Sequence, residues 1–230
     1  MVKNTKIKLL LVTFIAIITI GYSSFVFAGR LPQLFPFRKK DALDKWEEKI
    51  FKGRVLYKVR MRRTDGYLTA YSKKTASGIF YKLKFDPKKT PMVSWKWKVV
   101  RFPRKGKGEV ADSDWIEKDD YAARFYVIFP KLAFTLTKTL EYVWDKEIPE
   151  GTIMTSPYFE NIKIIVAESG KRNRGKWVFE ERNVYEDFKK AFNREPEEVG
   201  AIAIMTDTDN TASTAEAHYD EIKVGYKHEE

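Results

Sequence analysis

The stretch Gly200-Ala-Ile-Ala-Ile-Met-Thr-Asp-Thr-Asp-Asn-Thr211 joins an apolar run to a polar loop near the C-terminus. A second run, His218 to Tyr226, alternates apolar and polar residues, and both runs are typical of β-strands. The connection between them, 207–217, is longer than a hairpin needs, and long loops tend to be functional. It holds the densest group of oxygen ligands and turn formers in the chain: Asp207, Asp209 and Asn210. The stretch therefore predicts two strands with a candidate site between them.

Apolar and polar residues alternate with a period of two along most of the chain before this stretch. We expect strands over 55–62, 67–72, 79–85, 95–99, 121–129, 140–144, 162–167 and 177–181. Several of these runs have one apolar and one charged face, as an antiparallel sheet with one side in the core requires. Trp95 and Trp97 share such an apolar face, so we expect both in the core.

Few stretches have the period of a helix. The apolar residues of 184–192 recur every fourth position, with Asn183 placed to cap the start and Asn193 to end the helix. The stretch 41–52 fits either a short amphipathic helix or a first strand. The sequence therefore predicts an all-β fold, an antiparallel β-sandwich of the jelly-roll or galactose-binding-like kind with one or two short helices. A barrel is the alternative.

The beginning of the chain has the pattern of a secretory signal. Three lysines and no acid precede an apolar run over 9–20, and Ala28 ends a pattern that a signal peptidase reads. An uncleaved anchor is the alternative, because 9–28 is uncharged and about long enough to span a bilayer. We expect a periplasmic or extracellular protein with three parts: a signal peptide over 1–28, a linker over 29–40 and a single β-sandwich domain over 41–230.

Composition limits the class of protein further. With 230 residues, 43% of them hydrophobic, the chain is long enough for one sizeable core and short for two. The absence of cysteine excludes disulfides, cysteine-ligated zinc and a thiol nucleophile. The net charge of +11 favours a polysaccharide or another anionic envelope component as partner, unless the lysines only solvate the strands. No nucleic acid is expected, and membrane contact is expected only through an uncleaved signal.

The loop after the first quoted run has two physical uses. Asp207 and Asp209 with Asn210 beside them supply oxygens for Ca²⁺ or hydrogen-bonding groups for the vicinal hydroxyls of a sugar. The alternative is that these side chains bond to their own backbone and only form the turn. Calcium, at Asp207 and Asp209, is the only cofactor that the residues suggest. The loop is not an EF-hand, because the glycine and the distal glutamate of that motif are absent.

A second group of candidate residues surrounds an apolar strand. Asp119 and Asp120 precede it, and Arg124 is the one charge within it. A buried arginine needs a carboxylate, so we expect Arg124 to pair with Asp119, Asp120, Asp207 or Asp209. The alternative is that Arg124 binds an anionic group of a ligand. Trp115 stands in a polar segment and is a candidate platform for stacking on a sugar ring.

A series of motifs occurs in order along the chain: Ser94-Trp-Lys-Trp-Lys-Val99, Lys118-Asp-Asp-Tyr-Ala-Ala-Arg-Phe-Tyr-Val-Ile-Phe129, Tyr142-Val-Trp144, Ser156-Pro-Tyr158, Arg182-Asn-Val-Tyr-Glu-Asp-Phe188 and Met205-Thr-Asp-Thr-Asp-Asn-Thr211. Together they resemble an uncharacterised family of exported bacterial proteins known only as a domain of unknown function. The resemblance spans 46–226 and implies an exported single domain without an established activity. A looser similarity, carried by Tyr219-Asp-Glu-Ile222, is to β-sandwich carbohydrate-binding modules.

Three functions fit these observations. The first is a non-catalytic envelope module that binds a carbohydrate or another polyanion through Trp115, Asp119, Asp120, Arg124, Asp207, Asp209 and Asn210. The second is a polysaccharide hydrolase or lyase that uses carboxylates, and the third is a purely structural envelope protein. Acyl-transfer chemistry is not supported, because no nucleophile motif accompanies His218. No catalytic residue is assigned.

Overall fold

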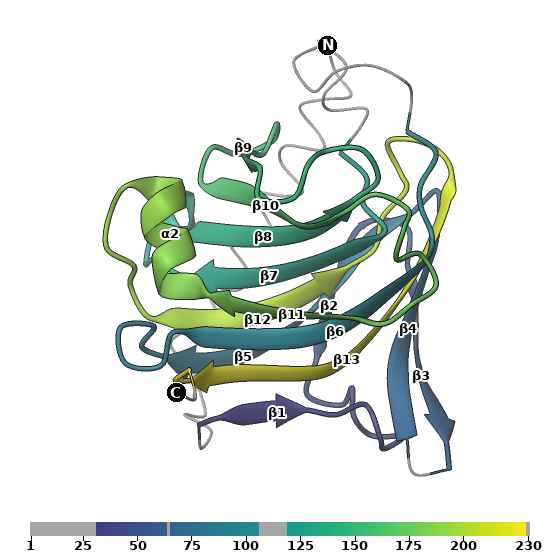
Figure 1. Ribbon diagram of the computed structural model, residues 1–230, viewed down its shortest axis with the longest axis horizontal. Coiled ribbons are helices and arrows are strands. Elements are labelled where there is room, and N and C mark those ends of the chain that lie inside the picture. The colour runs from purple at the N-terminus through teal and green to yellow at the C-terminus, as the bar shows by residue number, and fades with distance from the viewer. Residues whose placement is uncertain (1–30, 64, 106–118, 229–230) are drawn as a thin grey trace.

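The computed structural model describes residues 31–63, 65–105 and 119–228, which form two stacked β-sheets (Figure 1). Sheet A has the order β11-β6-β13-β4-β3, with β1 paired to β13 beyond the end of β4. Its strands are β1 (Gln33–Phe35), β3 (Leu56–Arg62), β4 (Asp65–Lys73), β6 (Met92–Arg101), β11 (Val178–Asn183) and β13 (Thr214–Tyr226).

Sheet B has the order β2-β5-β12-β7-β8-β10-β9. Its strands are β2 (Glu47–Lys52), β5 (Ala76–Phe85), β7 (Ala123–Phe129), β8 (Lys138–Asp145), β9 (Ile153–Thr155), β10 (Ile162–Ser169) and β12 (Val199–Met205). Among the described strands all neighbours are antiparallel except β8 and β10. The predicted antiparallel β-sandwich is therefore confirmed, with one parallel pair that the sequence did not indicate.

The core lies between the two sheets and is rich in aromatic rings. Trp95 and Trp97 of β6 are fully buried there, which confirms the expectation from their spacing. The ring of Trp95 stacks on Phe125 of β7, with centroids 4.4 Å apart, and also contacts Tyr142 of β8. These contacts join the inner faces of sheets A and B, so the two sheets form one domain around one core.

The predicted helix is present as α2 (Val184–Phe192). Asn183 caps it by accepting a hydrogen bond from the backbone of Glu186, and Asn193 ends it in the left-handed conformation. Val184 and Phe188 are the buried residues of its apolar side. A short 3-10 helix, η3 (Phe134–Leu136), follows β7. No helix within the described residues is long and apolar enough to cross a membrane.

Two boundaries differ from those that the sequence predicts, and one open alternative is decided. Part of the expected linker over 29–40 belongs to the domain, because Gln33–Phe35 forms β1 and the side chain of Phe37 is buried. Of the helix and the first strand that both fit 41–52, the structure has the strand, as β2. Strand β13 begins at Thr214, so the loop after β12 spans only 206–213. The expected signal peptide lies outside the described residues.

Sheet B also has a buried layer on the side away from the core. Residues of β7 alternate, so Phe125 faces the core while Tyr126 belongs to a separate apolar cluster on the outer side. Met205, the last residue of β12, and Phe80 of β5 belong to the same outer cluster. This outer face of sheet B is where the candidate site lies.

Candidate functional site

Arg124 is the centre of the site. It precedes Phe125 on β7, so strand alternation directs its side chain to the outer face of sheet B. The strand register places Arg124 beside Met205 of β12 on one side and Val143 of β8 on the other. Only 3% of Arg124 is exposed, so its charge needs partners within the protein.

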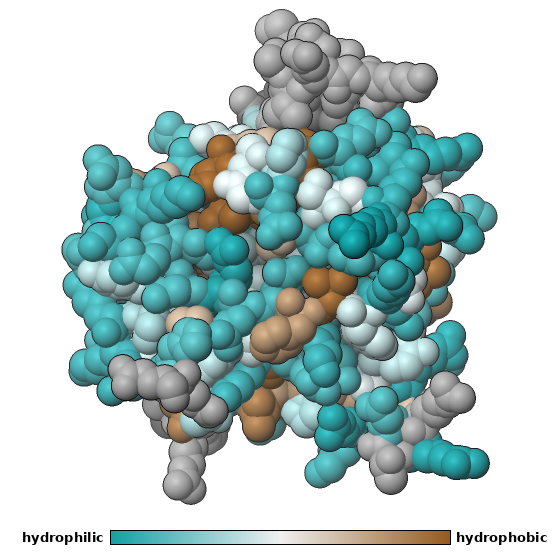
Figure 2. Space-filling model, in the orientation of Figure 1, coloured by the Kyte–Doolittle hydropathy of each residue, from teal (hydrophilic) through white to brown (hydrophobic). Residues whose placement is uncertain are grey.

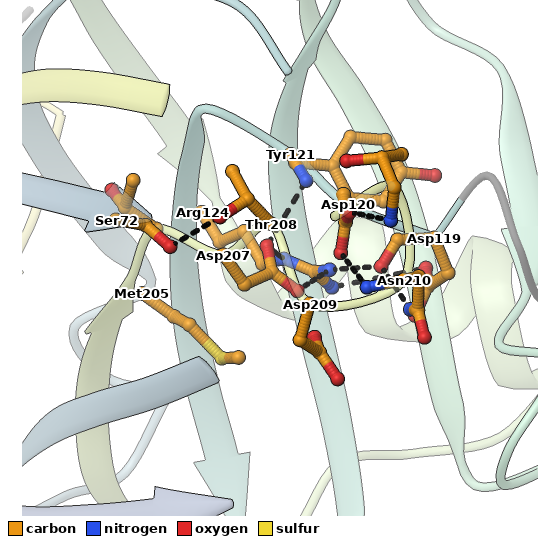
Figure 3. A network of polar contacts seen from close by, with 12 residues as sticks. Ser72, Asp119, Asp120, Tyr121, Arg124, Met205, Asp207, Thr208, Asp209 and Asn210 are labelled. Carbon is orange, nitrogen blue, oxygen red and sulfur yellow. Dashed lines mark hydrogen bonds and ion pairs between the residues drawn. The ribbon is translucent and has the colours of Figure 1, made fainter. Parts of the chain in front are cut away.

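Every nitrogen of the Arg124 guanidinium is engaged (Figure 3). Nε donates to Asp207 Oδ1 at 2.9 Å and Nη2 donates to Asp207 Oδ2, which makes a two-pronged pair. Nη1 donates to Glu141 Oε1 of β8, and Nη2 also donates to the carbonyl of Asp119 at 2.7 Å. Of the four acids that the sequence offers as partners of Arg124, Asp207 makes the close ion pair, and the carboxyl group of Asp119 lies 3.8 Å from Nη1. Because these partners occupy all three nitrogens, we assign Arg124 to hold the site together and not to bind an anionic ligand.

Polar contacts from sheet A and from the segment before β7 fix the 206–213 loop. Asp120 accepts hydrogen bonds from the backbone N–H groups of Asn210 and Thr211, at 3.3 and 2.6 Å. The hydroxyl of Thr208 contacts that of Ser72, on β4 of sheet A, at 2.7 Å. Figure 3 shows Asp120 and Ser72 on opposite sides of the loop. The loop is therefore rigidly placed before any ligand arrives.

A small pocket opens beside this network. It has a volume of about 30 Å³ and is lined on its polar side by Asp119, Ser156, Tyr158, Asp209 and Asn210. The amide of Asn210 donates to the Tyr158 hydroxyl at 2.9 Å and to the Asp119 carbonyl at 3.2 Å. A volume of this size holds one or two waters. A ligand can therefore insert a single polar group, such as a hydroxyl, while the rest of it lies outside.

Asp119 carries a buried carboxyl oxygen that the network leaves without a hydrogen bond. Its Oδ1 is buried and has no hydrogen-bond partner among the described residues, and it lies 3.8 Å from Arg124 Nη1. The single charge of Arg124 already faces Glu141 and Asp207 at closer range. Burial therefore raises the pKa of Asp119 to about 7, an effect that Arg124 only partly offsets.

This pKa predicts how stability changes with pH. The folded protein keeps a proton on Asp119 up to about pH 7, whereas the unfolded chain releases it near 3.8. The stability linked to this proton is full below pH 3.8 and is lost as pH rises through 7. We expect the Asp119→Asn variant, which cannot ionise, to gain on the order of 1–3 kcal/mol relative to the wild type between about pH 5 and 8.

Urea unfolding of both proteins across this pH range measures the difference. Asp44→Asn, at an exposed carboxylate, is the matched control and should follow the wild type. A constant difference between Asp119→Asn and the wild type at all pH values would contradict the assignment.

Three carboxylates are close enough to hold a cation. One oxygen each of Asp120, Asp207 and Asp209 lies within 4.8 Å of the others. However, both oxygens of Asp207 accept from Arg124, and both oxygens of Asp120 accept backbone N–H groups. Of the three, only the carboxylate of Asp209 accepts no hydrogen bond from another described residue, and it lies 3.9 Å from Lys52. These three carboxylates thus leave few free oxygens to coordinate calcium. Calcium binding at Asp207 and Asp209 stays a prediction.

The structure brings most of the predicted site residues together: Asp119, Asp120, Arg124, Asp207, Asp209 and Asn210. Trp115 lies outside the described residues. Sequence reasoning missed Glu141 and Tyr158, which reach the same place from β8 and from the segment between β9 and β10. The sequence gives one indication that Glu141 belongs to the site. It is the one acid in the predicted strand over 140–144, just as Arg124 is the one charge in the predicted strand over 121–129.

Solved structures with a similar fold include carbohydrate-binding modules and an enzyme domain. The family 11 carbohydrate-binding module of the cellulosomal cellulase Lic26A-Cel5E of Clostridium thermocellum is 12% identical, with a TM-score of 0.44 over 81% of this chain and 90% of that one. The family 30 module of the cellulase Cel9D-Cel44B of the same organism is 8% identical, with a TM-score of 0.44 over 80% and 93%. The xyloglucanase domain of NopAA from Sinorhizobium fredii, solved with cellobiose, is 6% identical, with a TM-score of 0.43 over 85% and 96%.

Sequence comparison identifies the family but no function. No curated protein matches the chain. A family model does match, over residues 44–223, which is close to the 46–226 over which the motifs resemble an uncharacterised family. The chain therefore belongs to the family described as protein of unknown function DUF3047.

Proposed function

We propose that the protein is an exported, non-catalytic module that binds a carbohydrate on the outer face of sheet B. One observation carries the proposal: Asp119 has a buried Oδ1 without a partner among the described residues, and Asp119 is one of the residues that line a pocket together with Asn210 and Tyr158. A native protein rarely leaves a buried oxygen unsatisfied without a reason. A ligand hydroxyl that enters the pocket supplies the missing donor.

The other groups of the pocket suit a sugar. Carboxylate, amide and hydroxyl groups converge there, and together they can both donate hydrogen bonds to the hydroxyls of a sugar and accept hydrogen bonds from them. Rings of Tyr126 and Tyr158 line the pocket, and flat aromatic rings favour the apolar C–H faces of sugars. Export, which rests on the signal-like pattern over 1–28, would place the module where polysaccharides are found.

Co-sedimentation with insoluble cellulose, xylan, chitin and peptidoglycan tests the proposal. We expect the wild type to be retained by one of these polymers at both low and high salt, because the pocket contacts are hydrogen bonds and not exposed ion pairs. Asp119→Ala removes both carboxyl oxygens and with them the open acceptor, which an amide would keep. We expect it to weaken binding by at least about tenfold, or 1.4 kcal/mol.

The control is Asp44→Ala, at an exposed carboxylate, which should bind as the wild type does. Retention of Asp119→Ala at wild-type affinity would refute the role of the pocket. Failure of the wild type to bind any of the polymers would refute the proposed function itself.

Asp119 also favours a second candidate, a polysaccharide hydrolase. A carboxyl group with a pKa of about 7 can donate a proton to a glycosidic oxygen near neutral pH. Asp209, in the same pocket, is then the partner carboxylate. Release of reducing ends from a bound polymer by the wild type, but not by Asp119→Asn, would establish this activity. Binding of the polymer without any product over long incubation would exclude the hydrolase and leave the binding function as the only candidate.

A further inference from the structure

A row of side chains crosses the outer face of sheet A, on the far side of the core from the Asp119 pocket. Trp97 of β6 points into the core, so the next residue, Lys98, lies on the outer face. The strand register places Lys98 opposite His218 of β13, His218 opposite Thr69 of β4, and Thr69 opposite Lys58 of β3. The row therefore runs perpendicular to the strands.

Aromatic rings surround Lys98 in this row. Its Nζ lies 4.9 Å from the ring centre of Trp177, which directly precedes β11, and 5.4 Å from that of Tyr67 on β4. Tyr67 meets Trp177 edge to face, with centroids 5.7 Å apart, and lies 4.9 Å from the ring of His218. We call this group the sheet A platform: Lys58, Arg60, Tyr67, Lys98, Trp177 and His218.

The platform is open to solvent although it contains large rings. Trp177 is 40% exposed, and Phe179, two residues further along, is 56% exposed. The space-filling view shows a face that is mostly hydrophilic, with separate hydrophobic patches between the polar side chains (Figure 2). Exposed rings within a polar surface are typical of a binding surface for a partner that is itself largely polar.

The charge of the platform is positive and uncompensated. Within the described part of the chain, no carboxylate lies within ion-pair distance of Lys58, Arg60 or Lys98, whereas the neighbouring Lys96 pairs with Glu221 at 2.7 Å. Glu216, the acid next to the platform on β13, contacts His218 Nε2 at 3.1 Å. Three cations are thus left to attract an anionic partner.

We propose that the sheet A platform binds a polysaccharide whose sugar units carry carboxylates. A sugar ring stacks on Trp177, and uronate groups along the polymer pair with Lys98, Lys58 and Arg60. The backbones of Trp177 and Lys58 lie at the two ends of a row that spans five strands, roughly 19 Å at the usual strand spacing. The ring of Trp177 reaches back over this row to the ring of Tyr67 on β4, 5.7 Å away, so the stacking surface and the cations of β3 suit neighbouring units of one polymer. Binding here is independent of the Asp119 pocket, which lies on the opposite sheet.

Binding to bead-coupled polygalacturonate, with hydroxyethyl cellulose as the neutral polymer, tests the inference. We expect the wild type to bind polygalacturonate at low salt and more weakly at high salt, because the cations are exposed. Trp177→Ala should weaken binding at least about fivefold, since stacking on one ring is worth about 1 kcal/mol or more. The pair Lys58→Gln with Arg60→Gln should weaken it at least about tenfold at low salt and reduce its dependence on salt.

Matched variants distinguish binding by the sheet A platform from binding that depends only on the net charge of the protein. Lys89→Gln with Lys190→Gln removes the same charge at exposed positions away from the platform, and it should bind polygalacturonate nearly as the wild type does. Asp119→Ala should also bind polygalacturonate normally, so the platform and the pocket can fail separately. Urea midpoints confirm that every variant is folded.

Three results would overturn the inference. The first is no binding of polygalacturonate by the wild type. The second is an equal loss of binding in the platform pair and the control pair, which would show that only net charge matters. The third is equally tight binding of single-stranded DNA with the same dependence on Trp177, because bases also stack on aromatic rings.

Discussion

Replacing Arg124 with methionine is expected to lower the free energy of unfolding by about 3–5 kcal/mol, the usual cost of removing one partner from a buried ion pair. The substitution leaves Asp207 and Glu141 buried, each without the cation to which it is bonded. It also frees the 206–213 loop from the outer face of sheet B. Urea unfolding measures the loss, which corresponds to a decrease of roughly 6–20 °C in melting temperature for a chain of this length.

Two further variants sharpen this result. Arg124→Lys should recover little of the loss, because an ammonium group is a point charge and cannot bond to Asp207 and Glu141 in the planar geometry of a guanidinium. Arg172→Met changes an exposed arginine that makes no ion pair among the described residues, and it should stay within about 0.5 kcal/mol of the wild type. A small effect of Arg124→Met would mean that the network contributes nothing to the fold.

The second large effect is expected from Trp95→Ala, with a loss of about 3–5 kcal/mol. Trp95 is fully buried between the sheets, stacked on Phe125 and in contact with Trp97 and Tyr142. Removal of the indole leaves a cavity that rings from both sheets surround, and the sheets cannot close it without losing their other contacts. Urea unfolding followed by circular dichroism measures the change.

Trp177→Ala is the matched control for this core substitution. The same atoms are removed, but from a side chain that is 40% exposed, so we expect a loss of about 1 kcal/mol or less. Equal losses at the two positions would contradict the division of the tryptophans into core and surface. The same Trp177 variant serves the polygalacturonate experiment, which requires that it be folded.

The sandwich could be predicted well because the alternation of apolar and polar residues in the sequence matches the inner and outer faces of the strands in the structure. The positions of Trp95 and Trp97 follow directly from a period of two, and α2 follows from a period near four with an asparagine at each end. Strand β1 was missed because three residues between prolines read as a tether, while pairing with β13 is a tertiary contact. The start of β13 was missed because the alanines at 215 and 217 are small and carry a weak pattern.

The site was predictable only in part. A lone arginine in an apolar strand requires an acid, which correctly indicated Asp207 and Asp119. Glu141 could be added only if β7 and β8 were known to be neighbours, and nothing in one sequence gives the order of strands. The pocket residue Tyr158 comes from an irregular segment, where no period constrains the direction of a side chain.

The 206–213 loop connects a strand of sheet B to a strand of sheet A and is bonded to both sheets, through Asp207 to Arg124 of β7 and through Thr208 to Ser72 of β4. Its shape therefore exists only while the two sheets are assembled, so a ligand of this loop has no affinity for the unfolded chain. Binding and folding are then thermodynamically linked, and a saturating ligand adds to stability by mass action. At a concentration one hundred times its dissociation constant the gain is about 2.7 kcal/mol. The melting temperature of the whole domain thus reports whether the loop is occupied.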